Sequence, residues 1–283
     1  MGTNTRAVFV TGAAGGIGTA TVRALSERGH RVYAGVRAEA PHLRDLAGVE
    51  QVRIDVTDPG SVAAAAEEVA RLEDGEGLAG VVNNAGVIVQ GPLELVPAGE
   101  LHRQFAVNVF GPVEVTRAFA PLLRTGGGRL INISAPTARL AMPFAGPISA
   151  SKAALDALSD AARVELAGQG IAVITVVPGS VETEIFAKAN AAAETALASA
   201  DPARLALYRR QIEAVDAAVA RMRGAGPDRV ARTIVRALEA SRPRARYAAG
   251  SDVRPALMLA RLPSRLRDRV VVRMLGLGKA AAA

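Results

Sequence analysis

The chain has 283 residues, of which 50% are apolar and 22% charged, and it contains no cysteine. This length and composition favour one large α/β domain with a well-buried core. The lack of cysteine excludes disulfides and thiolate metal ligands, and the three histidines (His30, His42 and His102) are too scattered to form a zinc motif. No secretory leader pattern is visible, and no apolar stretch approaches the ~20 residues that cross a bilayer. We therefore expect a cytoplasmic protein without a metal site.

The net charge of +7 lies almost entirely at the C-terminal end of the chain. After Ala240 there are nine arginines and one lysine against Asp252 and Asp268, so residues 1–240 are close to neutral. A nucleic-acid interface would combine such charge with aromatic residues or a known reading motif, and this segment offers only Tyr247. A nucleic-acid partner is therefore not expected.

Apolar runs alternate with helical patterns along the chain. Strands are predicted at 7–10, 31–35, 52–54, 80–82, 129–133, 172–177 and 246–248, and helices near 17–28, 61–72, 100–123 and 149–167. Strands separated by helices of crossover length predict a parallel sheet with helices on both faces, which is the doubly wound, Rossmann-type α/β arrangement. We expect residues 1–283 to form a single dinucleotide-binding domain.

Two segments depart from this alternation. Residues 184–226 are rich in alanine and helical in pattern, and they are too few for a core of their own, which predicts a helical insertion over a substrate site. Residues 253–277 mix leucines with arginines in the pattern of a basic amphipathic helix. Such a helix can lie in a membrane interface. We favour the alternative, in which its apolar stripe packs on the domain or on a second subunit and the arginines stay in water.

A glycine-rich turn, Thr11-Gly12-Ala13-Ala14-Gly15-Gly16-Ile17-Gly18, follows the first predicted strand and opens into a helix. Glycines at 12, 16 and 18 let the backbone turn tightly and approach a pyrophosphate, whose charge the helix N-terminus would hold. An ordinary strand-to-helix loop is the simpler interpretation of a glycine turn alone. Because the strand and the helix are both predicted, we interpret this turn as a dinucleotide-phosphate site.

Further motifs follow in the order found in one enzyme family. They are Asp55 after the third strand, Asn83-Asn84-Ala85-Gly86 after the fourth, Asn108 in the next helix, Lys152, and Pro178-Gly179 with Thr183. Over residues 6–185 the chain resembles the short-chain dehydrogenase/reductase family. The resemblance implies that Asp55 and Val56 flank an adenine, that Asn83 to Gly86 stabilise the sheet and contact the adenosine ribose, and that Pro178 to Thr183 contact the nicotinamide amide.

The cofactor site that the glycine turn and the resemblance together imply consists of Gly12, Ala14, Gly16, Ile17, Gly18, Arg37, Asp55, Val56, Asn84, Ala85, Gly86, Lys152, Pro178, Gly179, Val181 and Thr183. The preference for NAD(H) or NADP(H) depends on the residue at the end of the second strand, where NAD-binding proteins usually carry an acidic residue. This chain has Ala34-Gly35-Val36-Arg37 there, and a guanidinium can pair with a 2′-phosphate. We therefore expect NADP(H) rather than NAD(H); the alternative is that Arg37 is a solvated loop residue and either nucleotide binds.

The chain departs from the family at its catalytic positions. The family carries Tyr-x-x-x-Lys, with a serine thirteen positions before the tyrosine. With Lys152 as the lysine, the tyrosine position is Ile148 and the serine position is Ala135. Of the usual Asn-Ser-Tyr-Lys set only Asn108 and Lys152 remain.

The resemblance gives these losses a specific chemical meaning. In the family reaction the tyrosine transfers a proton to or from the substrate oxygen, the serine orients that oxygen, and the lysine lowers the tyrosine pKa and binds the nicotinamide ribose. Isoleucine and alanine can do neither of the first two tasks. Lys152 keeps its cofactor-binding role, and Asn108 is expected to keep the helix geometry and a water molecule that the lysine uses.

Other side chains near the site are alternatives to the missing tyrosine and serine. A hydroxyl without an adjacent base has too high a pKa to act alone. We therefore expect ordinary structural roles for the nearby hydroxyls, with Ser134 in the sheet packing, and solvated rim positions for the nearby charges. Tyr208 is the one tyrosine expected to be able to reach over the cleft. The residues considered are Ser134, Thr137, Ser149, Ser151, Tyr208, Arg139, Glu182 and Glu184.

Three functions remain open from the sequence. The first is an atypical NADP(H)-dependent oxidoreductase whose substrate needs no proton from a tyrosine. The second is a non-redox isomerase, lyase or cyclase on the same fold, and the third is a cofactor-binding pseudoenzyme. Ile148 and Ala135 make the site more apolar than usual, which favours a hydrophobic small-molecule substrate. The family resemblance implies a homodimer or homotetramer.

Overall fold

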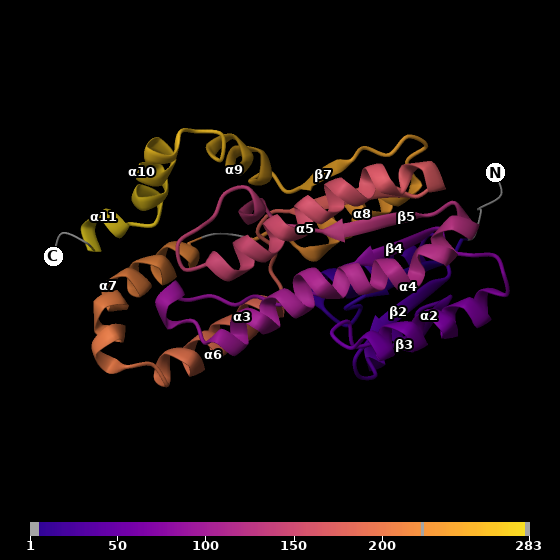
Figure 1. Cartoon of the computed structure of the whole chain (residues 1–283), viewed down its shortest axis with the longest axis horizontal. Helices are drawn as coiled ribbons and strands as arrows, with labels where there is room; N and C mark the ends of the chain where they lie inside the picture. Colours follow the sequence, from indigo (N-terminus) through magenta and orange to yellow (C-terminus); the bar gives the residue numbers. More distant parts are fainter. Residues whose placement is uncertain (1–5, 222–223, 281–283) are drawn as a thin grey trace.

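The computed structural model describes residues 6–221 and 224–280, and within them seven parallel strands form one sheet in the order β3-β2-β1-β4-β5-β6-β7 (Figure 1). The strands are β1 (Val8–Thr11), β2 (Val32–Val36), β3 (Val49–Arg53), β4 (Gly80–Asn83), β5 (Arg129–Ile133), β6 (Ala172–Pro178) and β7 (Arg246–Ala249). The order reverses between β1 and β4, which is where ligands bind in sheets of this kind. The predicted Rossmann-type fold is confirmed.

The described helices are α1 (Gly16–Ser26), α2 (Pro59–Glu73), α3 (Ala98–Phe105), α4 (Gly111–Gly126), α5 (Gly146–Glu165), α6 (Glu184–Ala198), α7 (Pro202–Val219), α8 (Pro227–Glu239), α9 (Val253–Leu259), α10 (Ser264–Met274) and α11 (Leu277–Ala280). Helices cover both faces of the sheet, whereas α7, α10 and α11 lie away from it (Figure 1). The core under one face includes Leu25 of α1 and Ile234 of α8. The core under the other includes Val69 of α2 and Phe119 of α4, whose ring stacks on Phe9 of β1 at 4.3 Å. Because both faces are buried, the strands are nearly continuous apolar runs.

The helix predicted near 100–123 is longer and less regular than expected. It runs from α3 through a five-residue π-helical turn, Ala106–Phe110, into α4. Such wide turns often occur at functional sites, and this one contains Asn108. Helix α5 begins at Gly146, earlier than the predicted residue 149, with Pro147 in its first turn. Ile148 therefore lies inside the helix.

Most of the described residues in the segment 184–226 lie in helices, as the pattern predicts. It contains α6 and α7, and a parallel bridge between Val181 and Ala225 ties its two ends together. Its function as a cover for substrate stays a prediction.

The basic segment 253–277 is helical, as its pattern predicts, but it is divided into three helices. The segment forms α9, α10 and α11, because Pro263 interrupts the first helical run and Gly276, at φ +70°, ends the second. Its apolar side packs on the domain as expected, since Val271 and Leu275 form a cluster with Leu140. Among the described residues, none of the helices has the length and apolar character to cross a membrane.

Candidate functional site

The glycine turn between β1 and α1 has the geometry of an anion cradle. Gly12 has φ +63°, and a Cβ there would stand 2.8 Å from the Cα of Ala85. A Cβ at Gly18 would collide with the carbonyl oxygen of Gly12. Helix α1 has no side-chain cap and no acidic residue in its first turn, so its first amides are left for a ligand. The turn can therefore receive a pyrophosphate.

The loop after β4 is fastened to this turn by Thr11, at the last position of β1. The Thr11 hydroxyl accepts hydrogen bonds from the amides of Asn84 and Ala85, both at 3.0 Å. The Asn84 side chain donates to the carbonyls of Thr11 (2.9 Å) and Gly12 (3.1 Å). Sequence reasoning left Thr11 out of the predicted site, although its place at the strand end was visible. It sets the separation between the phosphate turn and the ribose-side loop.

Two buried amide side chains hold the chain that follows Gly86. Oδ1 of Asn108 accepts from the amide of Val87 at 2.9 Å, and its Nδ2 donates to the carbonyl of Val87 at 2.9 Å. One turn earlier, Oε1 of Gln104 accepts from the amide of Val89 at 2.7 Å. The sequence analysis did not include Gln104 in the predicted site, although this residue stands four positions before Asn108 and so on the same side of the helix. The two amides fix the loop that borders Lys152.

Lys152 lies at the centre of the assembled motifs. Its Nζ donates to the carbonyl oxygen of Ile133 at 2.7 Å. A Cβ added to Gly86 would stand 4.0 Å from this Nζ and 3.5 Å from Oδ1 of Asn108, so the loop after β4, the π turn and α5 meet here. Burial lowers the pKa of Lys152 to about 8, while the negative charge of Asp156 raises it. The ammonium form therefore dominates at neutral pH and can donate hydrogen bonds to a ribose.

The two replaced catalytic positions border the same place. Ile148 is 9% exposed and precedes Lys152 by one helical turn, which puts both side chains on one side of α5. Ala135 follows the end of β5 by two residues, has an extended backbone (φ −156°, ψ 160°) and is partly exposed. Neither side chain can donate a proton.

Most of the neighbouring hydroxyls are engaged elsewhere. Ser149 donates to the carbonyl of Ala145 at 2.6 Å, and Ser151 donates to the carbonyl of Ile148 at 2.9 Å. Thr137 differs, because its hydroxyl is buried and has no hydrogen-bond partner among residues 6–221 and 224–280. Among the described residues near the site, Thr137 therefore keeps an unpartnered hydroxyl.

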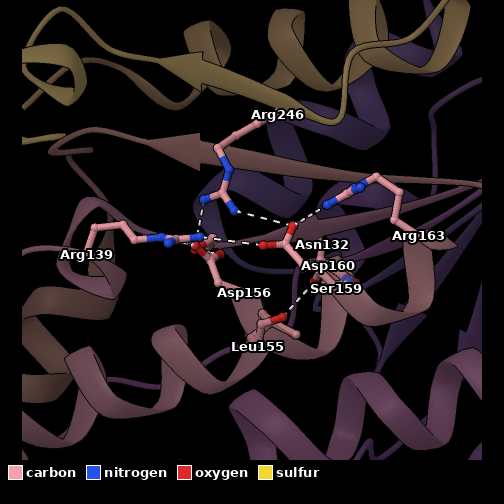
Figure 2. Close-up of polar contacts among 9 residues, drawn as sticks. Asn132, Arg139, Leu155, Asp156, Ser159, Asp160, Arg163 and Arg246 are labelled. Atoms are coloured by element: carbon pink, nitrogen blue, oxygen red, sulfur yellow. Dashed lines mark hydrogen bonds and ion pairs between the residues drawn. The ribbon is translucent and has the colours of Figure 1, made fainter.

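A buried carboxylate, Asp156, stands one turn beyond Lys152 and has three hydrogen-bond partners, of which Figure 2 labels Arg139 and Arg246. It is 2% exposed and accepts hydrogen bonds from Ser134 (2.6 Å), from Arg246 of β7 (2.6 Å) and from Arg139 (3.3 Å). Arg139, expected to be a solvated rim charge, is thus paired, although its side chain is 49% exposed. Ser134 is buried beside the sheet, where its amide donates to the carbonyl of Val176 at 2.8 Å, and its hydroxyl donates to Asp156.

The half of the site expected to bind adenosine lies after β2 and β3. Arg37 directly follows β2 and is exposed. Asp55 accepts hydrogen bonds from the amide (2.9 Å) and hydroxyl (2.7 Å) of Thr57. These bonds lower the pKa of Asp55, and the positive charge of Arg37 lowers it further, so the two residues are electrostatic neighbours. Val56 is buried against α4, where a Cβ at Gly111 would stand 3.0 Å from Cγ2 of Val56.

The segment after β6 returns to the glycine turn. The amide of Gly179 donates to the carbonyl of Ala249 at 3.2 Å. Thr183 packs so closely on the turn that a Cβ at Gly16 would stand 2.5 Å from its Cγ2. The predicted nicotinamide-side and phosphate-side residues are therefore brought together by the fold.

Tyr208 is held by contacts with Glu94 and Phe144. Its hydroxyl donates to Glu94 at 2.8 Å, which raises the pKa of Tyr208, and its ring meets Phe144 edge-on at 6.5 Å. Phe144 itself has φ +63°, a strained backbone for a non-glycine residue. Glu184 is exposed and pairs with Lys188 at 3.0 Å. Tyr208 thus joins α7 to Glu94 and to the loop before α5.

Comparison with known proteins agrees with this geometry. Residues 6–194 match the family model described as short chain dehydrogenase. The chain is 39% identical over 189 residues to "Estradiol 17-beta-dehydrogenase 2" of Rattus norvegicus and 33% identical over 183 residues to "3-amino-tetrahydro-pyrrolizinone reductase" of Xenorhabdus hominickii. These matches cover 64% and 65% of this chain but only 49% and 64% of those proteins. The "NADPH-dependent 3-dehydrocapnine reductase" of Ornithobacterium rhinotracheale is 32% identical over 279 residues, which are 94% of this chain and 95% of that protein.

Solved structures extend the likeness to the whole fold. A short chain dehydrogenase from Burkholderia cenocepacia, in complex with NADP, is 30% identical with a TM-score of 0.73 over 95% of this chain and 98% of that one. A short-chain dehydrogenase from Streptomyces avermitilis is 28% identical with a TM-score of 0.76 over 99% and 98%. A short chain dehydrogenase/reductase from Burkholderia phymatum, in complex with NAD, is 25% identical with a TM-score of 0.76 over 90% and 92%. The glycine turn, the Asn loop, Asn108 and Lys152 thus stand in a chain that belongs to the short-chain dehydrogenase/reductase family of oxidoreductases.

Proposed function

We propose that the protein is an NADP(H)-dependent oxidoreductase that transfers hydride to or from a hydrophobic small molecule without a tyrosine acid. The observation that carries the proposal is the contrast within α5 and its neighbours. The cofactor side, with Lys152 bonded to Ile133 and Asn108 fixed to Val87, is assembled, whereas Ile148 and Ala135 stand where the proton-transfer pair would be. The chemistry that remains is hydride transfer with the proton supplied from elsewhere.

The residues present fit a dinucleotide. The uncapped N-terminus of α1 and the glycine turn would hold the pyrophosphate, Lys152 would hold the nicotinamide ribose, and Arg37 would pair with a 2′-phosphate. NADP(H), when bound, supplies or accepts the hydride. Support for this choice comes from the name of the NADPH-dependent Ornithobacterium relative and from NADP in the Burkholderia cenocepacia structure; the Burkholderia phymatum neighbour holds NAD.

The substrate is inferred from what the site lacks. A carbonyl that becomes an alkoxide needs a proton donor, and a positioned donor contributes about 10²- to 10⁴-fold in rate. An iminium ion accepts hydride and becomes a neutral amine without a proton. A strongly polarised conjugated system accepts hydride and becomes a delocalised enolate, which takes its proton from water. The side chain of Ile148 favours an apolar substrate. The similarity to a protein named for estradiol supports a hydrophobic ligand.

The reaction is tested by comparing two matched sets of hydrophobic substrates with NADPH. We expect turnover of cyclic iminium ions or conjugated carbonyls and nearly none of saturated ketones, because neither Ile148 nor Ala135 supplies a proton. Loss of nicotinamide fluorescence follows the rate. Ketone turnover at ordinary rates would show that another acid has been recruited. Tight NADPH binding without any hydride transfer would instead favour the non-redox enzyme or the pseudoenzyme.

Cofactor preference is tested separately at Arg37. The unchanged protein should bind NADPH more tightly than NADH, and Arg37→Asp should reverse this order, because a carboxylate repels the 2′-phosphate and accepts hydrogen bonds from a free ribose diol. Titration by calorimetry measures both constants. The matched control is Arg71→Asp, which makes the same charge change in the exposed last turn of α2, the turn that leads to the amino end of β4, and should leave the ratio unchanged. A preference that survives Arg37→Asp would remove Arg37 from the site.

A further inference from the structure

Helices α9 and α10 have an outer side that the domain does not cover. Their inner sides are buried through Val253, Val271 and Leu275. On the outer sides, arginines alternate with large apolar side chains. The exposed residues are Arg254, Met258, Arg261, Arg265, Leu266, Arg269, Val272, Arg273 and Met274, and they are called the outer tail face below.

The spacing on α10 separates the two kinds of side chain into neighbouring rows. Arg265, Arg269 and Arg273 recur every four residues and so lie on one side of the helix. Leu266 and Met274, which are 47% and 60% exposed, follow the same spacing one residue further along. On α9, Met258 is 69% exposed and lies four residues after Arg254. Packing on the domain, which the sequence predicted, accounts for the inner side only.

The arginines of this face carry charge that the structure does not neutralise. In the described residues the acidic side chains of the tail are engaged elsewhere: Asp268 pairs with Arg267 at 3.3 Å, and Asp252 accepts a hydrogen bond from the amide of Ser180 at 2.8 Å. Within residues 6–221 and 224–280, no acidic side chain lies in ion-pair distance of the face's five arginines (Arg254, Arg261, Arg265, Arg269 and Arg273). The face is therefore cationic with exposed apolar side chains among its charges.

We propose that the outer tail face docks on the surface of an anionic lipid bilayer. Lipid phosphates would neutralise the arginine row, and Met258, Leu266 and Met274 would enter the boundary between headgroups and acyl chains. A second copy of the chain fits worse, because a twofold contact would place the arginines of one copy against those of the other. Nucleic acid fits worse too, since the exposed side chains between the arginines are aliphatic and not aromatic.

Docking would also bring the insertion, residues 184–226, close to the membrane. The tail packs on α7 through a cluster that includes Leu277, Val215 and Ala218, and in Figure 1 α10 and α11 lie beside α7. A docked protein would therefore hold α7 close to the bilayer, where hydrophobic molecules concentrate. Only this consequence rests on the proposed function; the docking itself does not.

The test is flotation of the full-length protein with vesicles of phosphatidylcholine alone or mixed with phosphatidylglycerol. We expect binding to the mixed vesicles only, weakened by salt. Because each arginine near an anionic surface contributes about fivefold to partitioning, the triple variant Arg265→Gln, Arg269→Gln, Arg273→Gln should lose about a hundredfold. The control makes the same charge change on α8, at the exposed Arg229, Arg232 and Arg236, and should stay within about twofold of the unchanged protein.

A second variant tests the apolar part without changing charge. Leu266→Ser with Met274→Ser should bind the mixed vesicles several-fold more weakly, because both side chains are exposed in the folded protein and lose only their insertion into lipid. The proposal is overturned if the unchanged protein does not float with mixed vesicles, or if the α10 and α8 triple variants lose binding equally. Self-association in sedimentation that disappears in the α10 triple variant, with no flotation, would assign the face to a second copy.

Discussion

Ile148→Tyr together with Ala135→Ser is expected to create NADPH-dependent reduction of hydrophobic ketones in a protein that has little of it. The new phenol would stand one helical turn before Lys152 and on the same side of α5. The neighbouring ammonium favours the phenolate and so lowers the pKa of the phenol towards the useful range. A positioned general acid contributes about 10²- to 10⁴-fold, which sets the upper limit of the gain in kcat/KM.

The structure accommodates serine at position 135 more easily than tyrosine at position 148. Ala135 is partly exposed with an ordinary extended backbone, so a hydroxymethyl group can be added there without strain. Ile148 is 9% exposed, and tyrosine is larger, so α5 and the loop before it must give way. Overpacking of this kind typically costs about 1–3 kcal/mol of stability. The gain in rate should therefore fall short of its upper limit.

The matched control is Ile148→Phe with Ala135→Ser, which adds the same ring and the same serine without the phenol. Ketone reduction by the tyrosine variant and not by the phenylalanine variant would assign the gain to proton donation. Both variants must bind NADPH in a calorimetric titration. If the tyrosine variant is folded, binds NADPH and reduces no member of a broad hydrophobic carbonyl panel, the pocket serves other chemistry, and the non-redox interpretation moves ahead.

The sheet and the cofactor loops could be predicted because their signals are local. Each strand is a short apolar run, and the glycine turn and the Asn loop occupy fixed places after their strands. Helix ends were less predictable. The start of α5 at Gly146 depends on Pro147, a good first-turn residue that interrupts no apolar pattern. In the tail, the 3.6-residue pattern continues across 253–277 and so does not show that Pro263 separates two helices.

The network around Asp156 could not be predicted as a whole. Arg246 meets Asp156 across 90 positions of sequence, and only the parallel pairing of β6 with β7 brings them together. One part of the signal was visible, because Asp156 follows Lys152 at helical spacing. The same limit applies to Thr11, whose hydroxyl reaches residues more than 70 positions away.

Asp156→Asn is expected to destabilise the fold strongly, and Asp160→Asn only slightly. Both carboxylates pair with Arg139 and Arg246, and Figure 2 draws them in one network, but Asp156 is 2% exposed and Asp160 44%. Breaking a fully buried pair costs about 3–5 kcal/mol. Since Arg139 and Arg246 keep part of their solvent contact, we expect about 2 kcal/mol for Asp156→Asn and less than about 1 kcal/mol for Asp160→Asn. The midpoint of urea unfolding, at unchanged slope, measures both.

The same pair of variants should separate in the pH dependence of NADPH binding. Among the described residues, Asp156 is the acidic neighbour that raises the pKa of Lys152 against burial, and Arg139 and Arg246 contact the same carboxylate. NADPH affinity should be highest where Lys152 is protonated and should fall as the pH rises through about 8. Without the charge of Asp156 the pKa of Lys152 falls further, so the decline should begin at lower pH. Asp160→Asn, which leaves that charge in place, should not change the pH at which the decline begins.

Equal behaviour of the two variants in both measurements would mean that Asp156 supports neither the fold nor Lys152 in particular. Suppose that Asp156→Asn lowers the stability but does not change the pH at which NADPH affinity declines. Asp156 would then only link α5 to β7, and other groups would keep Lys152 protonated.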